Sequence, residues 1–149
     1  MNMVLREKNT VMKIFFILQF VCTLVAFSDK VIGTRSFDIS YGFQYVEKDI
    51  EYKDGVDHFH YLYFKDRNLG KISTYSISPD GQFAVFQNGS SSEIFLYDVS
   101  RDELNKLIKE RIGLVRDFEW DLINMNVRII LHKRGEEKVV PFRNRGEAK

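Results

Sequence analysis

The chain has 149 residues, with 22 Lys and Arg against 21 Asp and Glu, which gives a formal net charge of +1. This balance excludes a duplex-DNA-binding protein, which needs a strong excess of basic residues to displace counterions. Hydrophobic residues make up 44% of the chain and include 13 Phe and 7 Tyr. That is enough for a packed core and too much for a disordered chain. Two Pro and one Cys exclude collagen-like and disulfide-rich scaffolds.

Residues 1–28 have the pattern of a signal peptide. Lys13 is followed by 14 mostly apolar residues, a length that suits a signal-peptide core and is shorter than the roughly 20 residues of a membrane-spanning helix. Ala26 and Ser28 are small residues placed for a cleavage before Asp29. We therefore expect an exported protein, periplasmic or secreted, with an uncleaved N-terminal anchor as the alternative.

Residues 29–149 are predicted to form a single β-rich domain. Cleavage leaves 19 basic and 20 acidic residues in it, and Cys22, the single cysteine, lies in the leader. The domain therefore has no disulfide, no thiolate nucleophile and no Cys-bound zinc. We expect no nucleic-acid partner, and contact with a membrane only through an uncleaved leader.

The first part of this domain reads as strands joined by turns. Apolar residues alternate over Phe37–Val46, which predicts one continuous strand, and Asp54–Gly55 predicts a turn. The aromatic run His58–Phe64 indicates a strand that is buried on both faces or packed at an interface. A turn at Asn68–Gly70 and a strand at Ile72–Ile77 are predicted next.

The clearest hairpin joins Gln82–Gln87 to Glu93–Val99 through a loop that starts with Asn88 and Gly89. One short helix is expected near 101–112, because Ser100 and Glu103 form a capping box and apolar residues follow at helical spacing. Strands are expected again at 114–120, 126–132 and 137–142. The fold class is therefore mainly β, with antiparallel sheets and hairpins arranged as a sandwich or like propeller blades.

Residues Ile77–Asp98 contain an ordered set of motifs. Ile77-Ser78-Pro79-Asp80-Gly81 is followed by Phe83-Ala84-Val85-Phe86 and then by Ile94-Phe95-Leu96-Tyr97-Asp98. In this order the segment resembles one blade of a TolB-type, WD-repeat-like β-propeller. Pro79 presets φ for the turn, Asp80 bonds back to the backbone, and Gly81 adopts a conformation that a Cβ would forbid.

A second, degraded copy of this motif is proposed at Phe118–Val140, about 43 residues later, within the blade range of roughly 40–45 residues. A domain of about 121 residues falls short of the four blades or more of a typical closed propeller. The resemblance therefore implies a part-propeller, a propeller completed by other copies of the chain, or an open sheet that shares only the turn.

Candidate chemistry is sparse. His58 and His60 alternate along a predicted strand and share a face, a spacing found in metal-binding β proteins, with a third ligand still required for a catalytic zinc. The sequence has no Gly-x-Ser-x-Gly elbow and no phosphate loop. We expect a protein without cofactor, bound metal or catalytic residue, and a metal-dependent hydrolase that uses His58 and His60 is the alternative.

The aromatic strands favour a binding role. Tyrosine on a rigid β scaffold is a common anchor at protein interfaces, and the candidate binding residues are Tyr41, Tyr45, Tyr61 and Tyr63. The residues assigned to structural turns are Pro79, Asp80, Gly81, Asn88 and Gly89. The sequence thus predicts an exported, non-catalytic domain that binds another protein, such as a periplasmic inhibitor or immunity-type protein. A homo-oligomer that completes a propeller is a further alternative.

Overall fold

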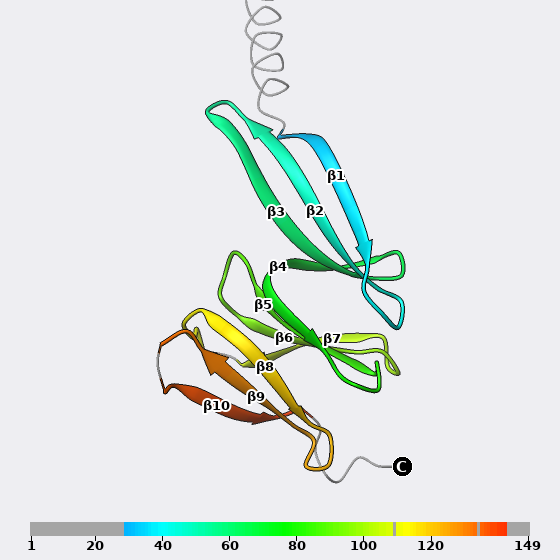
Figure 1. Ribbon diagram of the computed structural model, residues 1–149, viewed down its shortest axis with the longest axis vertical. Coiled ribbons are helices and arrows are strands. Elements are labelled where there is room, and N and C mark those ends of the chain that lie inside the picture. Colours follow the sequence, from blue (N-terminus) through cyan, green and yellow to red (C-terminus); the bar gives the residue numbers. More distant parts are fainter. Residues whose placement is uncertain (1–28, 109, 134, 143–149) are drawn as a thin grey trace, which may run out of the picture.

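The computed structural model describes residues 29–108, 110–133 and 135–142, which form ten antiparallel strands in two sheets (Figure 1). The first sheet contains β1 (Lys30–Asp38), β2 (Phe43–Tyr52), β3 (Gly55–Phe64), β4 (Arg67–Ile77), β5 (Phe83–Asn88), β6 (Ile94–Asp98) and β7 (Glu103–Ile108). The second contains β8 (Val115–Asp121), β9 (Asn126–Leu131) and β10 (Glu137–Pro141), in the order β10-β9-β8. The predicted mainly β fold is confirmed. The predicted signal peptide, residues 1–28, lies outside the described residues.

Strand β4 divides the first sheet into an arm and a body. The arm consists of β1, β2 and β3, and Figure 1 shows it projecting beyond the remaining strands. β3 pairs with β2 along its whole length but with β4 only from Tyr61 to Phe64. From Ile72 onward β4 pairs with β5 instead. The sheet therefore turns at β4, and the outer half of the arm extends away from the body.

Two hydrophobic cores lie on the two faces of the body strands. Side chains alternate along β5, so that Phe83 and Val85 face the second sheet while Ala84 and Phe86 face the base of the arm. The first core adds Ile94, Leu96, Ile108, Ile112, Val115, Phe118, Val127, Ile129 and Leu131. The second adds Phe43, Leu62, Leu69, Ile72 and Tyr97. The body strands therefore form the middle of three layers.

Two predicted boundaries in the arm are wrong. The continuous strand over Phe37–Val46 is interrupted, because β1 ends at Asp38 and β2 begins at Phe43. Between them Tyr41 and Gly42 have φ values of 53° and 84°, which reverse the chain direction. The turn predicted at Asn68–Gly70 falls inside β4, since the chain already turns at residues 65–66. In the first place the apolar alternation runs across the turn, and in the second it runs beside it. Alternation alone therefore does not show where the chain turns.

The helix predicted near 101–112 is also wrong, because residues 103–108 form strand β7 beside β6. Asp98 Oδ1 accepts hydrogen bonds from Ser100 and from Arg101 N, so a turn takes the place of the helix cap. A register shift in the β6–β7 pair allows Leu104 to join one core and Ile108 the other. A bulged strand has thus produced apolar spacing that mimics a helix. No helix among the described residues is long and apolar enough to cross a membrane.

The Ser-Pro-Asp-Gly motif forms the turn between β4 and β5. Ser78 is buried, its Oγ donates to Asp80 Oδ1 over 2.6 Å, and it accepts the Phe83 N–H over 2.9 Å. The Gln82 N–H donates to Asp80 Oδ1 over 3.1 Å. Tyr41 lies over the turn and donates its hydroxyl to the Pro79 carbonyl over 2.8 Å. The motif therefore joins the start of the arm to the body.

Gly81 is required in this turn both by its φ of +71° and by lack of space. An added Cβ would lie 2.3 Å from the Tyr41 ring. We expect Gly81→Ala to lower the free energy of unfolding by about 2 kcal/mol, because a left-handed backbone and a collision add together. Gly135→Ala is the matched control, since Gly135 has a φ of +82° but open space around it. It should cost about 1 kcal/mol.

Urea unfolding measures both variants, and the comparison is repeated with Tyr41→Ala in the background. Removing the ring should reduce the effect of Gly81→Ala, with a remainder above that of Gly135→Ala because the Cβ of residue 41 itself lies 2.8 Å from the added Cβ. An undiminished effect would show that the Tyr41 ring does not limit the turn.

The other predicted turn joins β5 to β6. Asn88 Oδ1 accepts the N–H groups of Ser90 and Ser91 over 2.8 and 3.0 Å, which closes an Asx turn. The Gly89 N–H donates to the Lys71 carbonyl over 3.0 Å, and the positive φ of this loop, 58°, is at Ser92. Residues 118–140, the proposed second copy, form an antiparallel meander over β8, β9 and β10.

Candidate functional site

A groove of about 610 Å³ lies where the arm meets β4. β3 and β4 separate beyond the Tyr61–Lys71 pair, and the groove occupies the space between the diverging strands. Its walls come from the end of β1, from β2, from β3 and from the second half of β4. The lining residues are Phe37, Asp38, Ile39, Tyr45, His60, Ile72, Ser73, Thr74 and Tyr75.

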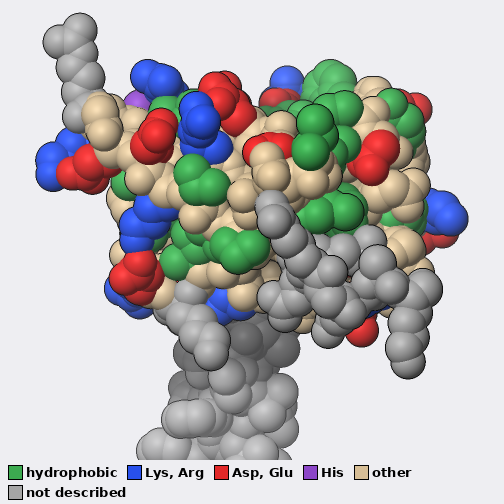
Figure 2. Space-filling model, turned by 90° about the horizontal axis from the view of Figure 1, so that it is seen from below, with side chains coloured by type: hydrophobic (Ala, Val, Ile, Leu, Met, Phe, Trp, Pro, Cys, Tyr) green, Lys and Arg blue, Asp and Glu red, His purple; other side chains and the backbone are tan. Residues whose placement is uncertain are grey.

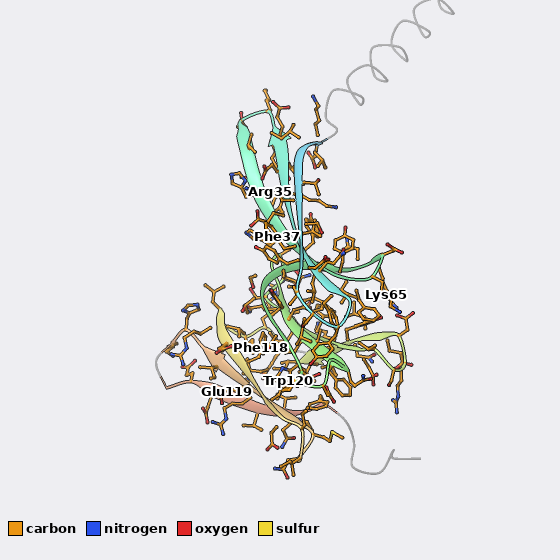
Figure 3. The ribbon with its side chains drawn as sticks, turned by 45° about the vertical axis from the view of Figure 1, so that its right-hand side comes forward. Arg35, Phe37, Lys65, Phe118, Glu119 and Trp120 are labelled. Carbon is orange, nitrogen blue, oxygen red and sulfur yellow. The ribbon has the colours of Figure 1, made fainter. Side chains whose placement is uncertain are left out.

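Aromatic rings make up one wall of the groove. The Tyr45 ring lies 6.0 Å from Phe37 and 6.1 Å from Tyr75, and it stacks on the His60 imidazole at 5.4 Å. Phe37 keeps 50% of its surface exposed, and Figure 3 shows it near the base of the arm. The groove therefore presents apolar surface to solvent at the point where the arm leaves the body.

The phenols of this wall stay neutral at physiological pH. Burial, together with the nearby Glu47 carboxylate, raises the pKa of Tyr45, and burial raises the pKa of Tyr75. The Tyr45 hydroxyl is hydrogen-bonded to His60 Nδ1. Tyr45 is thus fixed in place as a neutral aromatic surface, and its bond to His60 ties β2 to β3.

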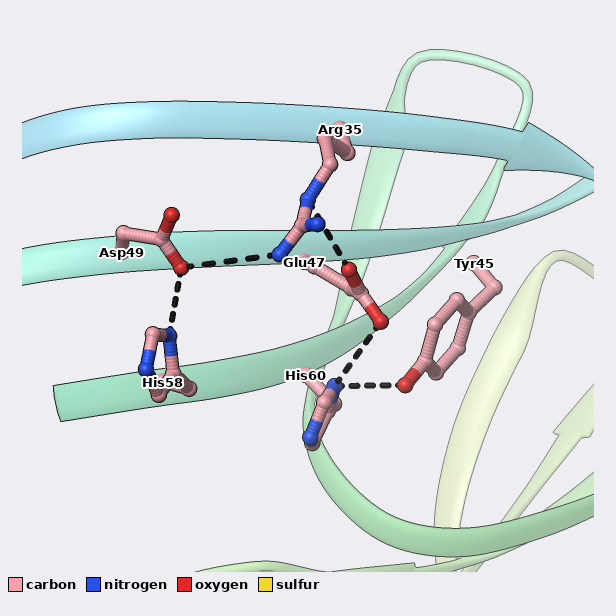
Figure 4. A network of polar contacts seen from close by, with 6 residues as sticks. All are labelled: Arg35, Tyr45, Glu47, Asp49, His58 and His60. Carbon is pink, nitrogen blue, oxygen red and sulfur yellow. Dashed lines mark hydrogen bonds and ion pairs between the residues drawn. The ribbon is translucent and has the colours of Figure 1, made fainter.

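A polar network continues from the groove along the same face of the arm (Figure 4). Arg35 Nε lies 3.1 Å from Glu47 Oε2, and His58 Nδ1 lies 2.7 Å from Asp49 Oδ1. His60 Nδ1 is 4.0 Å from Glu47 Oε1. The strand register places Arg35, Glu47 and His60 side by side, because directly opposed residues of antiparallel strands share a face.

The opposite face of the arm carries aromatic rings covered by lysines. Lys48 Nζ lies 4.9 Å from the Tyr61 ring centre and 3.1 Å from the Tyr63 hydroxyl. Lys71 Nζ lies 3.4 Å from the centre of the Phe59 ring. These cation–π contacts cover the rings within the chain itself, so this face is less open to a partner than the groove.

The four predicted binding tyrosines therefore lie in three places. Tyr45 lines the groove, Tyr61 and Tyr63 lie on the opposite face of the arm, and Tyr41 covers the Ser-Pro-Asp-Gly turn. Sequence reasoning did not single out Phe37 and Tyr75 as partners of Tyr45 in one wall. Phe37 and Tyr45 are paired across the β1–β2 hairpin, whose turn the apolar alternation conceals. Tyr75 joins them only because the sheet turns at β4.

His58 and His60 share a face as predicted, but each faces a carboxylate of β2. Among the residues that the structure describes, no group of three or more His, Cys, Asp or Glu side chains could hold a metal ion. The hydroxyl of Ser73, which lines the groove, donates to the backbone carbonyl and to the side-chain Oε1 of Gln87. The groove lining thus combines aromatic rings with a hydrogen-bonded hydroxyl–imidazole pair, Tyr45 and His60.

Comparison with known proteins identifies no family. No protein-family profile matches the chain, and no curated protein matches it. Acylaminoacyl peptidase from Pyrococcus horikoshii, in its uncomplexed structure, is 14% identical over 64% of this chain and 17% of its own, with a TM-score of 0.45. The orthorhombic crystal form of the same peptidase is 13% identical over 68% of this chain and 17% of its own, with a TM-score of 0.42. The chain spans 17% of the length of these structures, and likeness at this level defines neither fold nor activity.

Proposed function

We propose that this chain is a non-catalytic domain that binds another polypeptide in the groove between the arm and β4. The observation that carries this proposal is the exposed aromatic wall of Phe37, Tyr45 and Tyr75 beside a strand edge. Aromatic residues on rigid strands are the side chains enriched at interface centres. The hydrogen bonds of Tyr45 and His60 keep the wall in position before a partner arrives, which reduces the entropy lost on binding.

The outer face of the second sheet supports a binding module over a subunit of an oligomeric propeller. Phe118 is buried against the body, while Glu119 on the opposite face is exposed and pairs with Arg128 at 3.4 Å (Figure 3). Figure 2 shows the end of the molecule opposite the arm, where basic and acidic side chains are scattered among hydrophobic ones. The exposed Glu119–Arg128 pair on the outer face is typical of the end of a stack rather than of a contact with a further blade.

We also propose that β4–β7 and β8–β10 are two neighbouring propeller-like blades. Both are antiparallel meanders, and they pack face to face through one core. The Ser-Pro-Asp-Gly turn of the first meander supports this relation.

The specific version of the function is an exported inhibitor or immunity-type protein. The predicted leader supports export, and a small groove-bearing domain suits occlusion of a toxin or hydrolase. This part of the proposal rests on analogy of size and location. Intact mass of the chain from the envelope or secreted fraction tests it, with loss of residues 1–28 as the expected result and a full-length cytosolic chain as the contrary one.

The binding proposal is tested by photo-crosslinking in cells that naturally make the chain. A photo-reactive phenylalanine analogue replaces Phe37 in the groove or, as the control, Ile123, which is 94% exposed on the β8–β9 turn. We expect one discrete adduct with a different polypeptide at position 37 and none at 123. Equal adducts at both positions, or none at 37, would contradict the proposal. An adduct of twice the chain mass would instead indicate the homo-oligomer.

A further inference from the structure

We propose that the groove's partner adds an extended segment to the arm as a fourth strand, paired with the outer half of β3. This inference rests on the proposed polypeptide-binding function and names how the partner is held. Residues 55–60 of β3 pair with β2 on one side only, because the β4 partners begin at Tyr61. Such an edge can pair with an incoming strand.

The backbone groups that face this edge follow from the hairpin at the tip of the arm. A two-residue turn brings Tyr52 opposite Gly55, and the closing pair of such a turn exchanges hydrogen bonds. Alternate residues of β3 therefore bond to β2, and the N–H and C=O groups of Val56, His58 and His60 point outward. Leu62 continues this series, and it is paired with Gly70 of β4. The added strand would continue, over residues 55–60 of β3, the row of hydrogen bonds that β4 makes with β3 from Tyr61 to Phe64.

The other strand edges carry features that discourage pairing. The β1 edge has a register shift near Gly33, and the β7 and β8 pairs have register shifts too. The part of β4 that leaves β3 has a register shift between Ile72 and Thr74. β10 is short and contains Lys138 and Pro141. Bulges, lysines and prolines are the means by which natural sheets block edge pairing. Residues 55–60 contain no Lys, Arg or Pro and keep an unbroken register with β2, so this edge is the one suited to a partner strand.

The groove decides between a foreign strand and a second copy of the chain. It lies at the His60 end of the edge, where Ile72, Tyr45 and Tyr75 offer apolar surface. A second copy paired antiparallel through the same edge would bring its own tip residues, Lys53 and Asp54, toward this surface. The Asp54 carboxylate would approach aromatic ring faces, which carry partial negative charge, and the Asp38 carboxylate of the groove lining, and both disfavour it. We therefore assign the site to an extended segment of a different polypeptide, with an apolar or aromatic side chain at the end that enters the groove.

The test uses a random nine-residue peptide library displayed on phage as the probe. His58→Pro removes the outward N–H without touching the β2 pairing, because proline has no amide hydrogen and is tolerated at sheet edges. His58→Ala is the matched control, which loses the imidazole and keeps the N–H. We expect peptides selected on the wild-type chain to bind His58→Ala within about threefold and His58→Pro at least about tenfold more weakly. A cooperative thermal unfolding transition is the check that each variant is folded.

Amide hydrogen exchange with a selected peptide gives a second readout that needs no variant. The amides of Val56, His58 and His60 should exchange at least about tenfold more slowly with peptide, while those of Asp57 and Phe59, already bonded to β2, should not change. Equal binding to His58→Pro, uniform slowing, or recovery of no peptide on the wild-type chain would overturn strand addition. Crosslinking at Phe37 would still stand as the separate test of polypeptide binding.

Discussion

Replacing Gln87 by Leu is expected to lower the free energy of unfolding by about 3–5 kcal/mol. Gln87 is fully buried at the end of β5, and its amide joins three segments. Oε1 accepts the Val115 N–H over 2.9 Å, and Nε2 donates to the Gly113 carbonyl over 3.0 Å. Oε1 also accepts the Ser73 hydroxyl over 3.2 Å. Leucine fills a similar volume but leaves buried polar groups without partners, which is costly.

Gln82→Leu is the matched control, because it makes the same chemical change at an exposed position of the preceding turn. Its effect should stay within about 0.5 kcal/mol. Urea unfolding followed by circular dichroism gives both values, and hydrogen exchange of the Val115 amide reports the connection between the sheets directly. A Gln87→Leu variant as stable as the control would show that water replaces the glutamine.

The free energy of unfolding is expected to fall as the pH rises from 10 to about 12. Among single substitutions, one at Tyr97 should reduce the slope of this pH dependence most. Tyr97 is fully buried between the arm base and β7. Burial, and then its hydrogen bond to the Asp102 carboxylate, raise the pKa of Tyr97 to about 12. A folded-state pKa above the unfolded value means that the stabilisation is complete below pH 10 and is lost through pH 12.

The expected loss is at most about 1.4 kcal/mol for each pH unit in this window. Tyr97→Phe removes the ionising group and should flatten the slope, although the variant starts less stable at neutral pH because Asp102 loses a donor. Tyr41→Phe serves as the control, since it also removes a hydrogen-bonded hydroxyl, from a side chain that is 59% exposed. Free energies from urea unfolding at pH 8, 10 and 11.5 check this. An unchanged slope in Tyr97→Phe would contradict the assignment.

Part of the candidate site could have been predicted from local sequence. The Asp54–Gly55 signal predicts a hairpin here but not its register, because a connection over Asp54–Gly55 would set Asp49 opposite His60. The actual turn residues are Lys53 and Asp54, which set Asp49 opposite His58 and Glu47 opposite His60. Alternation then puts all four side chains on one face. Arg35 and Phe37 could not be added, because the apolar alternation over Phe37–Val46 conceals the turn at Tyr41 and Gly42. The pairing of β2 with β1 therefore could not be predicted from the sequence.

The sequence by itself determined the strand content, the Ser-Pro-Asp-Gly turn and the Asn88 hairpin, because each depends on residues within a few positions of one another. Only the tertiary structure decided that residues 103–108 are a strand, since β6 supplies the hydrogen-bonding edge for it. The same holds for the groove, whose wall joins Phe37, Tyr45 and Tyr75. Side-chain period reports which residues share a face, and it carries no information on which distant strand covers that face.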